Sequence, residues 1–213
     1  AYKTVLITGG ASGIGAATAK RFLDDGCRVC IVDHDRIARE NIATELEGLA
    51  GALHADVTDL SQVEAAFDIA VETLGHIDVV INNAGISVRH AFLDITAEDW
   101  HRVLSTNLTG VFYVAQTAAR HMMAGKGGVI LNTASTNGIT GYPFYADYNA
   151  SKAGVIALTR SMALELAPKV RVNAVAPGYV LTTMQRAEYT DEMLQEVNRK
   201  IPLGRHAEPR EIA

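Results

Sequence analysis

The feature that most constrains this 213-residue chain is an alternation of short apolar runs with longer amphipathic stretches, almost from end to end. Near-continuous apolar runs are typical of strands buried on both faces of a parallel sheet. Apolar residues three or four apart are typical of helices that cover such a sheet. The pattern therefore predicts an α/β fold with a doubly wound parallel sheet and helices on both faces. We expect strands at residues 4–8, 28–32, 50–55, 79–82, 129–134 and 171–174, and helices at 15–25, 36–47, 61–74, 98–123 and 147–167.

Bulk composition is typical of a globular protein that acts on small molecules. Hydrophobic residues make up 48% of the chain and charged residues 20%, and no linker, repeat or low-complexity segment interrupts the alternation. We therefore expect residues 1–213 to form a single domain. The formal net charge of −5, without basic runs, argues against nucleic acid as a partner, because neutralising phosphates requires a basic face.

Membrane, exported and metal-binding proteins are also disfavoured. No apolar run approaches the roughly 18 residues of a membrane helix. A strand-like run begins by Val5, which leaves no room for a signal peptide, so we expect a cytoplasmic protein. The seven histidines show no metal-ligand spacing, and no metal site is predicted. Cys27 and Cys30 have CxxC spacing, but on a strand they would point to opposite faces, so we interpret them as structural.

A glycine-rich turn, Thr8-Gly9-Gly10-Ala11-Ser12-Gly13-Ile14-Gly15, directly follows the first predicted strand and opens a helix. In a Rossmann-type fold such a turn brings the backbone close to a dinucleotide pyrophosphate at the helix N-terminus. Asp33 ends the next strand, where an acid accepts hydrogen bonds from the adenosine ribose and repels a 2′-phosphate. No Lys or Arg lies in the turn, so NAD is favoured over NADP as the cofactor.

Ligands of doubly wound sheets bind beyond the carboxyl ends of the strands. Several further polar motifs occur at those positions, and others lie on the helices. Tyr148 and Lys152 form a YxxxK pair on a predicted helix, thirteen residues after Ser135, and Asn107 lies in the long helix at 98–123. The other motifs are Asp56-Val57 after the third strand, Asn82-Asn83-Ala84-Gly85 after the fourth, and Pro177-Gly178 after the sixth, with Thr182 four residues on. In this order and spacing the motifs resemble those of the classical branch of the short-chain dehydrogenase/reductase family, over essentially the whole chain.

This resemblance implies an oxidoreductase that interconverts an alcohol and a ketone. Tyr148 would be the general acid/base, and Lys152, one helical turn away, would favour its phenolate form and hold the nicotinamide ribose. Ser135 would bind the substrate oxygen, and Asn107 would position a water in a proton relay to solvent. Asp147 points elsewhere around the helix and is interpreted as structural. Cofactor contacts are implied for Gly9, Ser12, Gly13, Ile14, Asp33, Asp56, Val57, Asn83, Gly85, Tyr148, Lys152, Pro177, Gly178, Val180 and Thr182.

Substrate choice is expected to lie beyond these motifs. Residues 179–201 form a charged helical segment that corresponds to a mobile lid in the family. Tyr142, Phe144 and Tyr145 are expected to form an aromatic wall. Arg89 and His90 are expected to add polarity, with Ser135 as a further polar contact. A small polyol, sugar or cyclic alcohol is the expected substrate class.

The resemblance also implies a homo-oligomer, a dimer or tetramer. It implies a last helix and a seventh parallel strand as well, which are absent from this sequence. Three alternatives stay open at this point: a non-catalytic NAD(P)-binding regulator, an NADP-dependent ketone reductase, and a sugar-nucleotide epimerase or dehydratase, whose chains are usually longer.

Overall fold

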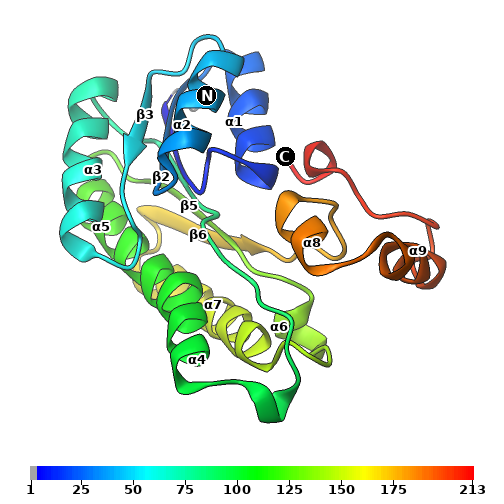
Figure 1. The fold of residues 1–213 in the computed structure, drawn as a ribbon. Helices are drawn as coiled ribbons and strands as arrows, with labels where there is room; N and C mark the ends of the chain where they lie inside the picture. Colours follow the sequence, from blue (N-terminus) through cyan, green and yellow to red (C-terminus); the bar gives the residue numbers. More distant parts are fainter. Residues whose placement is uncertain (1–3) are drawn as a thin grey trace.

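One parallel sheet of six strands organises the computed structural model, which describes residues 4–213 (Figure 1). The strand order is β3-β2-β1-β4-β5-β6, so the chain reverses direction across the sheet between β1 and β4. All five pairings are parallel, as predicted. The strands are β1 (Thr4–Thr8), β2 (Arg28–Asp33), β3 (Gly51–His54), β4 (Val79–Asn82), β5 (Gly128–Thr133) and β6 (Val170–Val175).

Alternate residues of the central strands enter two separate cores. Val5 and Ile7 of β1 pack with Val29 and Ile31 against α1 (Gly13–Asp24) and α2 (Arg36–Glu45). Leu6, between them, faces the opposite core under α3 (Leu60–Leu74) and α5 (Gly110–Ala124). This alternation follows from the two-residue period of a strand. Both faces of the sheet centre are therefore covered, which confirms the doubly wound architecture.

The predicted helix at 98–123 is interrupted in the structure. It consists of α4 (Ala97–Leu104), a π-helical segment η2 (Ser105–Thr109) and α5, which follow one another without a loop. One turn of π-helix changes the register of the side chains that follow it, and such turns often mark functional sites. The periodicity of the sequence did not reveal it, because the flanking helices keep the apolar pattern.

The C-terminal third contains α7 (Ala146–Glu165), which covers the sheet on the α5 side, and several short helices. Residues 179–201, the predicted lid, form α8 (Thr183–Glu188) and α9 (Asp191–Lys200). In Figure 1 both lie past the end of β6, apart from the helices that cover the sheet. The remaining short helices are η1 (Phe92–Asp94), α6 (Asn137–Thr140) and η3 (Pro209–Glu211).

Cys30 is fully buried in β2 and belongs to the α3 side, whereas Cys27 packs on the α1 side. Burial raises the pKa of the Cys30 thiol to about 11, so this group is protonated at neutral pH. The opposite orientations agree with the structural interpretation of the pair. Within residues 4–213, no helix has the length and apolar character needed to span a membrane.

Candidate active site

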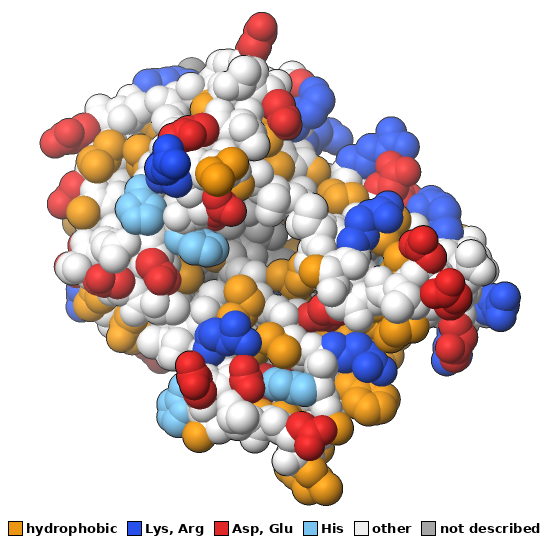
Figure 2. All heavy atoms as spheres, viewed as in Figure 1, with side chains coloured by type: hydrophobic (Ala, Val, Ile, Leu, Met, Phe, Trp, Pro, Cys, Tyr) orange, Lys and Arg blue, Asp and Glu red, His pale blue; other side chains and the backbone are white. Residues whose placement is uncertain are grey.

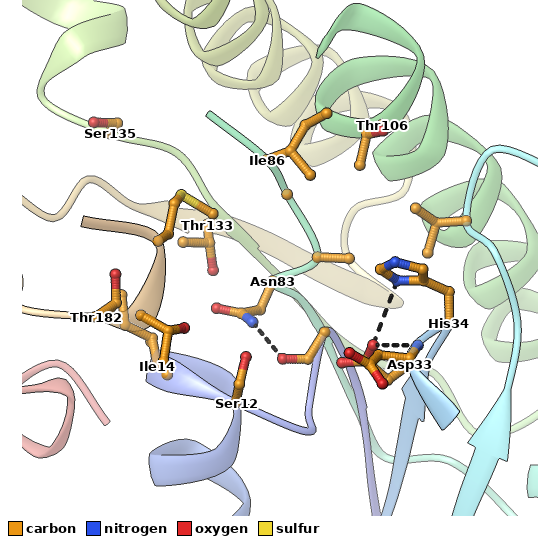
Figure 3. A pocket seen from close by; sticks show the side chains of 18 of the residues that line it. Ser12, Ile14, Asp33, His34, Asn83, Ile86, Thr106, Thr133, Ser135 and Thr182 are labelled. Atoms are coloured by element: carbon orange, nitrogen blue, oxygen red, sulfur yellow. Dashed lines mark hydrogen bonds and ion pairs between the residues drawn. The ribbon is translucent and has the colours of Figure 1, made fainter. Parts of the chain in front are cut away.

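A cavity of about 950 Å³ opens at the carboxyl ends of the strands and extends toward α8. Figure 2 shows the surface hollowed between the body of the molecule and the lobe formed by α8 and α9. In Figure 3 the Asp33–His34 pair and Ser135 lie on opposite sides of this cavity, with Ser12, Ile14 and Thr182 along its edge. All the residues predicted to contact the cofactor line it, from Gly9 to Thr182.

The glycine turn leaves the N-terminus of α1 open to this cavity. Gly9 has a φ of +60°, and a Cβ there would lie 2.7 Å from the Ala84 Cα. At the helix start, Ser12 makes no side-chain capping bond to any residue of the described part of the chain, and the first turn carries no acid. The first backbone N–H groups of α1 can therefore donate to an anion, which fits a pyrophosphate.

Asp33 lies at the end of β2 beside this turn. Its Oδ2 accepts a hydrogen bond from the Ala11 N–H at 3.2 Å, and its Oδ1 accepts one from the Asp35 N–H at 3.1 Å. The carboxylate thus holds the glycine turn against β2 as well as lining the cavity. Arg102 of α4, which the motifs did not single out, also lines the cavity and lies 3.0 Å from Asp99.

Ser135, Tyr148 and Lys152 meet where β5 ends against α7. Ser135 hydrogen-bonds Tyr148, and the Lys152 Nζ lies 5.6 Å from the centre of the Tyr148 ring. The buried Lys152 ammonium donates to the Thr133 carbonyl at 2.7 Å. A Cβ at Gly138 would lie 2.6 Å from the Lys152 carbonyl carbon, so α6 packs directly on α7 and fixes the loop that carries Ser135.

Burial is the largest influence on the pKa values of Tyr148 and Lys152. It raises the pKa of Tyr148, an effect that the Ser135 hydrogen bond opposes and the Glu188 carboxylate reinforces. It lowers the pKa of Lys152 to about 8. Lys152 was expected to favour the phenolate form of Tyr148; in the chain alone, burial outweighs any such attraction, so the net pKa of Tyr148 is raised.

Asn107 lies in the π-helical segment, fully buried, and outside the cavity lining. Its Oδ1 accepts from the Ile86 N–H at 2.8 Å and its Nδ2 donates to the Ile86 carbonyl at 2.8 Å. The Nδ2 also lies 3.2 Å from the Ser151 Oγ on α7. Asn107 therefore ties the segment after β4 to the helix that carries Tyr148 and Lys152.

Replacing Asn107 with alanine is expected to lower the free energy of unfolding by about 2 kcal/mol, because both backbone groups of half-buried Ile86 lose their partner in the fully buried Asn107 side chain. Thermal unfolding with and without cofactor measures the effect. Asn173→Ala is the matched control, since Asn173 is an exposed residue of β6. Equal effects of the two substitutions would show that the bonds to Ile86 contribute nothing.

A second cavity of about 350 Å³ joins the first under the lid. Tyr142 and Tyr145 line it, as predicted, and so does Ser135. His90 does not: its Nε2 lies 3.0 Å from the fully buried Asp147 Oδ2. His90 was expected to contact substrate, but in the structure its ring pairs with Asp147 instead of lining the second cavity.

Further residues from the segments expected to select the substrate also line the second cavity. Arg89 stacks over Phe144, 4.2 Å from the ring centre, and Phe144 adopts a φ of +71°, which is rare for a residue with a side chain. The others come from the lid segment, and they include Tyr179, Gln185, Glu188 and Tyr189. Among residues 4–213 no cluster of metal-ligating side chains is found.

Comparisons with known proteins agree with this geometry. The family model "short chain dehydrogenase" matches residues 3–193. Meso-2,3-butanediol dehydrogenase from Serratia marcescens is 39% identical over 99% of this chain and 84% of its own. A variant actinorhodin polyketide ketoreductase solved with NADPH is 34% identical, with a TM-score of 0.93, and covers 99% of this chain and 87% of its own. The 3-ketoacyl-(acyl-carrier-protein) reductase of Brucella melitensis, solved with NADH, has the same identity and coverages and a TM-score of 0.91.

Proposed function

Because this chain belongs to the short-chain dehydrogenase/reductase family of NAD(P)-dependent oxidoreductases, we propose that it interconverts a secondary alcohol and a ketone with NAD(H). The observation that carries this proposal is that the two cavities share Ser135 and Tyr148. One cavity has the glycine turn and the helix N-terminus that suit a dinucleotide. The other has the aromatic walls that suit a small organic substrate. The pair of hydroxyls lies where the two ligands would meet.

The residues at this junction can perform the proton transfer. When bound, the nicotinamide supplies or accepts the hydride. The Ser135 hydroxyl holds the substrate oxygen beside Tyr148, to which it is hydrogen-bonded. Tyr148 gives a proton to that oxygen during reduction and takes it back during oxidation. The buried ammonium of Lys152 favours the phenolate stage, and Asn107 keeps the Ile86 segment and α7 in register around the site.

Turnover of a panel of alcohols and ketones, followed at the NADH absorbance, tests this proposal directly. We expect oxidation of secondary alcohols with NAD and reduction of the matching ketones with NADH. The butanediol dehydrogenase and the ketoreductases among its relatives support a panel that contains diols, hydroxy ketones and cyclic ketones. Absence of turnover with either NADH or NADPH across the panel would contradict the proposal.

NAD is proposed as the preferred cofactor because Asp33 places a carboxylate at the ribose end of the first cavity. An NADP-dependent ketone reductase is the second candidate, since Arg102 lines the same cavity and one relative was solved with NADPH. Arg102 lies beside Asp99, which offsets its charge. The balance of these charges favours NAD.

Replacing Asp33 with asparagine tests this preference. Asparagine has nearly the same shape and keeps one acceptor, but it removes the charge that repels a 2′-phosphate. We expect the ratio of the Kd for NADPH to that for NADH to fall by about tenfold, since removing one like charge contributes on the order of 1 kcal/mol. Fluorescence titration measures both constants, and Asp35→Asn, two residues on, is the control. Tighter binding of NADPH than of NADH by the wild type would show that Asp33 does not set the preference.

A homo-oligomer, dimer or tetramer, is proposed for the protein in solution. Exposed apolar side chains on α5 and α7 support it, namely Phe112, Met123 and Leu164. Exposed large apolar side chains are typical of surfaces that are buried between subunits.

A further inference from the structure

Two polar atoms of α8 are buried without a partner beside the second cavity. The Glu188 Oε2 accepts a hydrogen bond from the Tyr145 hydroxyl at 2.9 Å, and that hydroxyl lies 3.0 Å from the Tyr189 hydroxyl. The other carboxylate oxygen, Oε1, has no hydrogen-bond partner within residues 4–213, and neither has the Gln185 Nε2. Buried polar groups are nearly always hydrogen-bonded, so two neighbouring exceptions require an explanation.

Gln185 and Glu188 lie on the side of the site where we expect the substrate to bind. Glu188 and Gln185 are three residues apart on α8 and therefore lie on the same face of the helix. Both line the second cavity, and Gln185 also lines the first, at the junction that contains Ser135 and Tyr148. Both unpaired atoms are inaccessible to solvent, so contact with a ligand in the cavity requires that the two side chains rotate.

The chemistry of the two atoms restricts the ligand group that can satisfy both. The Gln185 amide donates a hydrogen bond, and the Glu188 carboxylate accepts one. An ammonium group would satisfy Glu188 but not Gln185, because both nitrogens are donors. A carboxylate would satisfy Gln185 but would be repelled by Glu188. A hydroxyl group accepts from one and donates to the other, and it carries no charge.

The Glu188 charge acts on the reacting end of the site. The carboxylate raises the pKa of Tyr148 and, together with burial and the Tyr189 hydroxyl, that of Tyr145. The Tyr145 ring, whose hydroxyl donates to Glu188, lies 6.3 Å from the Tyr148 ring between centres, so one small molecule can reach both Glu188 and Tyr148. A substrate held by Ser135 and Tyr148 at its reacting oxygen can present a second group to α8.

We propose that Glu188 and Gln185 bind a second hydroxyl of the substrate, so that the preferred substrates are hydroxy ketones and the corresponding diols. This inference rests on the proposed function. It makes the lid segment a determinant of specificity: a substrate with the second hydroxyl satisfies both α8 side chains, whereas one without it leaves them unpaired in a closed site.

Matched ketone pairs test the inference. The wild type is expected to reduce acetoin and 2-hydroxycyclohexanone with a kcat/KM about 10- to 100-fold above those for 2-butanone and cyclohexanone, the range for a hydrogen bond to a charged group. Glu188→Gln keeps the shape but removes the charged acceptor. This substitution is expected to remove most of the preference, by lowering kcat/KM for the hydroxy ketones much more than for the plain ketones.

Two variants serve as controls. Glu196→Gln changes another lid carboxylate that lines the same cavity but lies 2.7 Å from Lys200, and it should keep the preference. Gln185→Leu should lose it, as Glu188→Gln does. NADH binding by each variant, measured by fluorescence, verifies its fold independently of turnover.

The outcomes separate the two proposals. Equal kcat/KM values for the members of each pair in the wild type, or equal losses on both members in Glu188→Gln, would contradict the α8 assignment alone. The second result is the one expected if the Glu188 and Gln185 side chains merely pair with each other. Absence of turnover of every ketone by the wild type, with NADH or NADPH, would contradict the oxidoreductase function instead.

Discussion

Replacing Tyr148 with phenylalanine is expected to lower kcat by about 10²- to 10⁴-fold, the range for loss of a general acid/base, while the Kd for NADH changes little. The substitution removes one oxygen atom and keeps the ring that lies under the Lys152 ammonium. The remaining contacts of the first cavity are untouched. Steady-state kinetics on the best substrate of the panel, with fluorescence titration of NADH, measures the two quantities.

The reason for so large an effect is that no described neighbour can replace the phenol. The Ser135 hydroxyl lies beside it, but its hydrogen-bond partners are Asn137 and Tyr148, and neither would make it a base. The Lys152 Nζ is engaged by the Thr133 carbonyl at 2.7 Å. Proton transfer would then have to come from water in a largely buried site.

Tyr113→Phe is the matched control, because Tyr113 lies on α5 and lines neither cavity. It should leave both kcat and NADH binding unchanged. The comparison also separates an enzyme from a non-catalytic NAD(P)-binding regulator on the same fold. Retention of full turnover by Tyr148→Phe would remove Tyr148 from the proton transfer, and loss of NADH binding would point to a structural role.

The sheet and the cofactor side of the site could be predicted because they depend on local sequence. Most predicted contacts of the first cavity lie at or after the end of a strand, as Asp33 ends β2 and Asn83 follows β4, whereas Tyr148 and Lys152 lie on α7. The carboxyl ends of parallel strands meet at one edge, so knowing the strands was enough to bring these residues together. Periods of two and 3.6 residues identify strands and helices without any knowledge of their neighbours.

The substrate side could be predicted only in part, because it depends on contacts between distant segments. His90 was expected in the cavity, but its orientation is set by Asp147, 57 residues away. Glu188 could not be singled out from the other charges of the lid, since its unpaired oxygen exists only when α8 packs beside Tyr145. The π-helical turn at Asn107 was also hidden, because it arises from packing against Ile86 rather than from helix propensity.

Replacing Lys152 with methionine is expected to have two opposite effects. Turnover should fall by at least about 10²-fold, the scale for loss of a preorganised charge at the reacting group. The chain without cofactor should, in contrast, unfold at a temperature about 2–6 °C higher at pH 7, the shift expected for a gain of roughly 1–2 kcal/mol in a chain of this size. Kinetics and differential scanning calorimetry measure the two effects.

The gain in stability follows from the pKa of the buried ammonium. Burial lowers it from 10.5 to about 8, which corresponds to a cost of about 3 kcal/mol for folding with the charge present. Loss of the hydrogen bond to the Thr133 carbonyl offsets about 1 kcal/mol of the gain. Methionine has a similar length and carries no charge, so the difference remains as stability.

The sign of the pH dependence distinguishes this cause from simple repacking. Between about pH 8 and 10.5 the unfolded wild type holds more protons at Lys152 than the folded chain does, so this group makes folding more favourable as pH rises. The advantage of Lys152→Met is therefore expected to be full below pH 8 and to shrink through this window. Lys126→Met, at an exposed lysine, should show no such trend. A Lys152→Met chain that is less stable than the wild type at pH 7 would mean that the ammonium stabilises the fold, and that the site bears no cost for keeping a charge beside Tyr148.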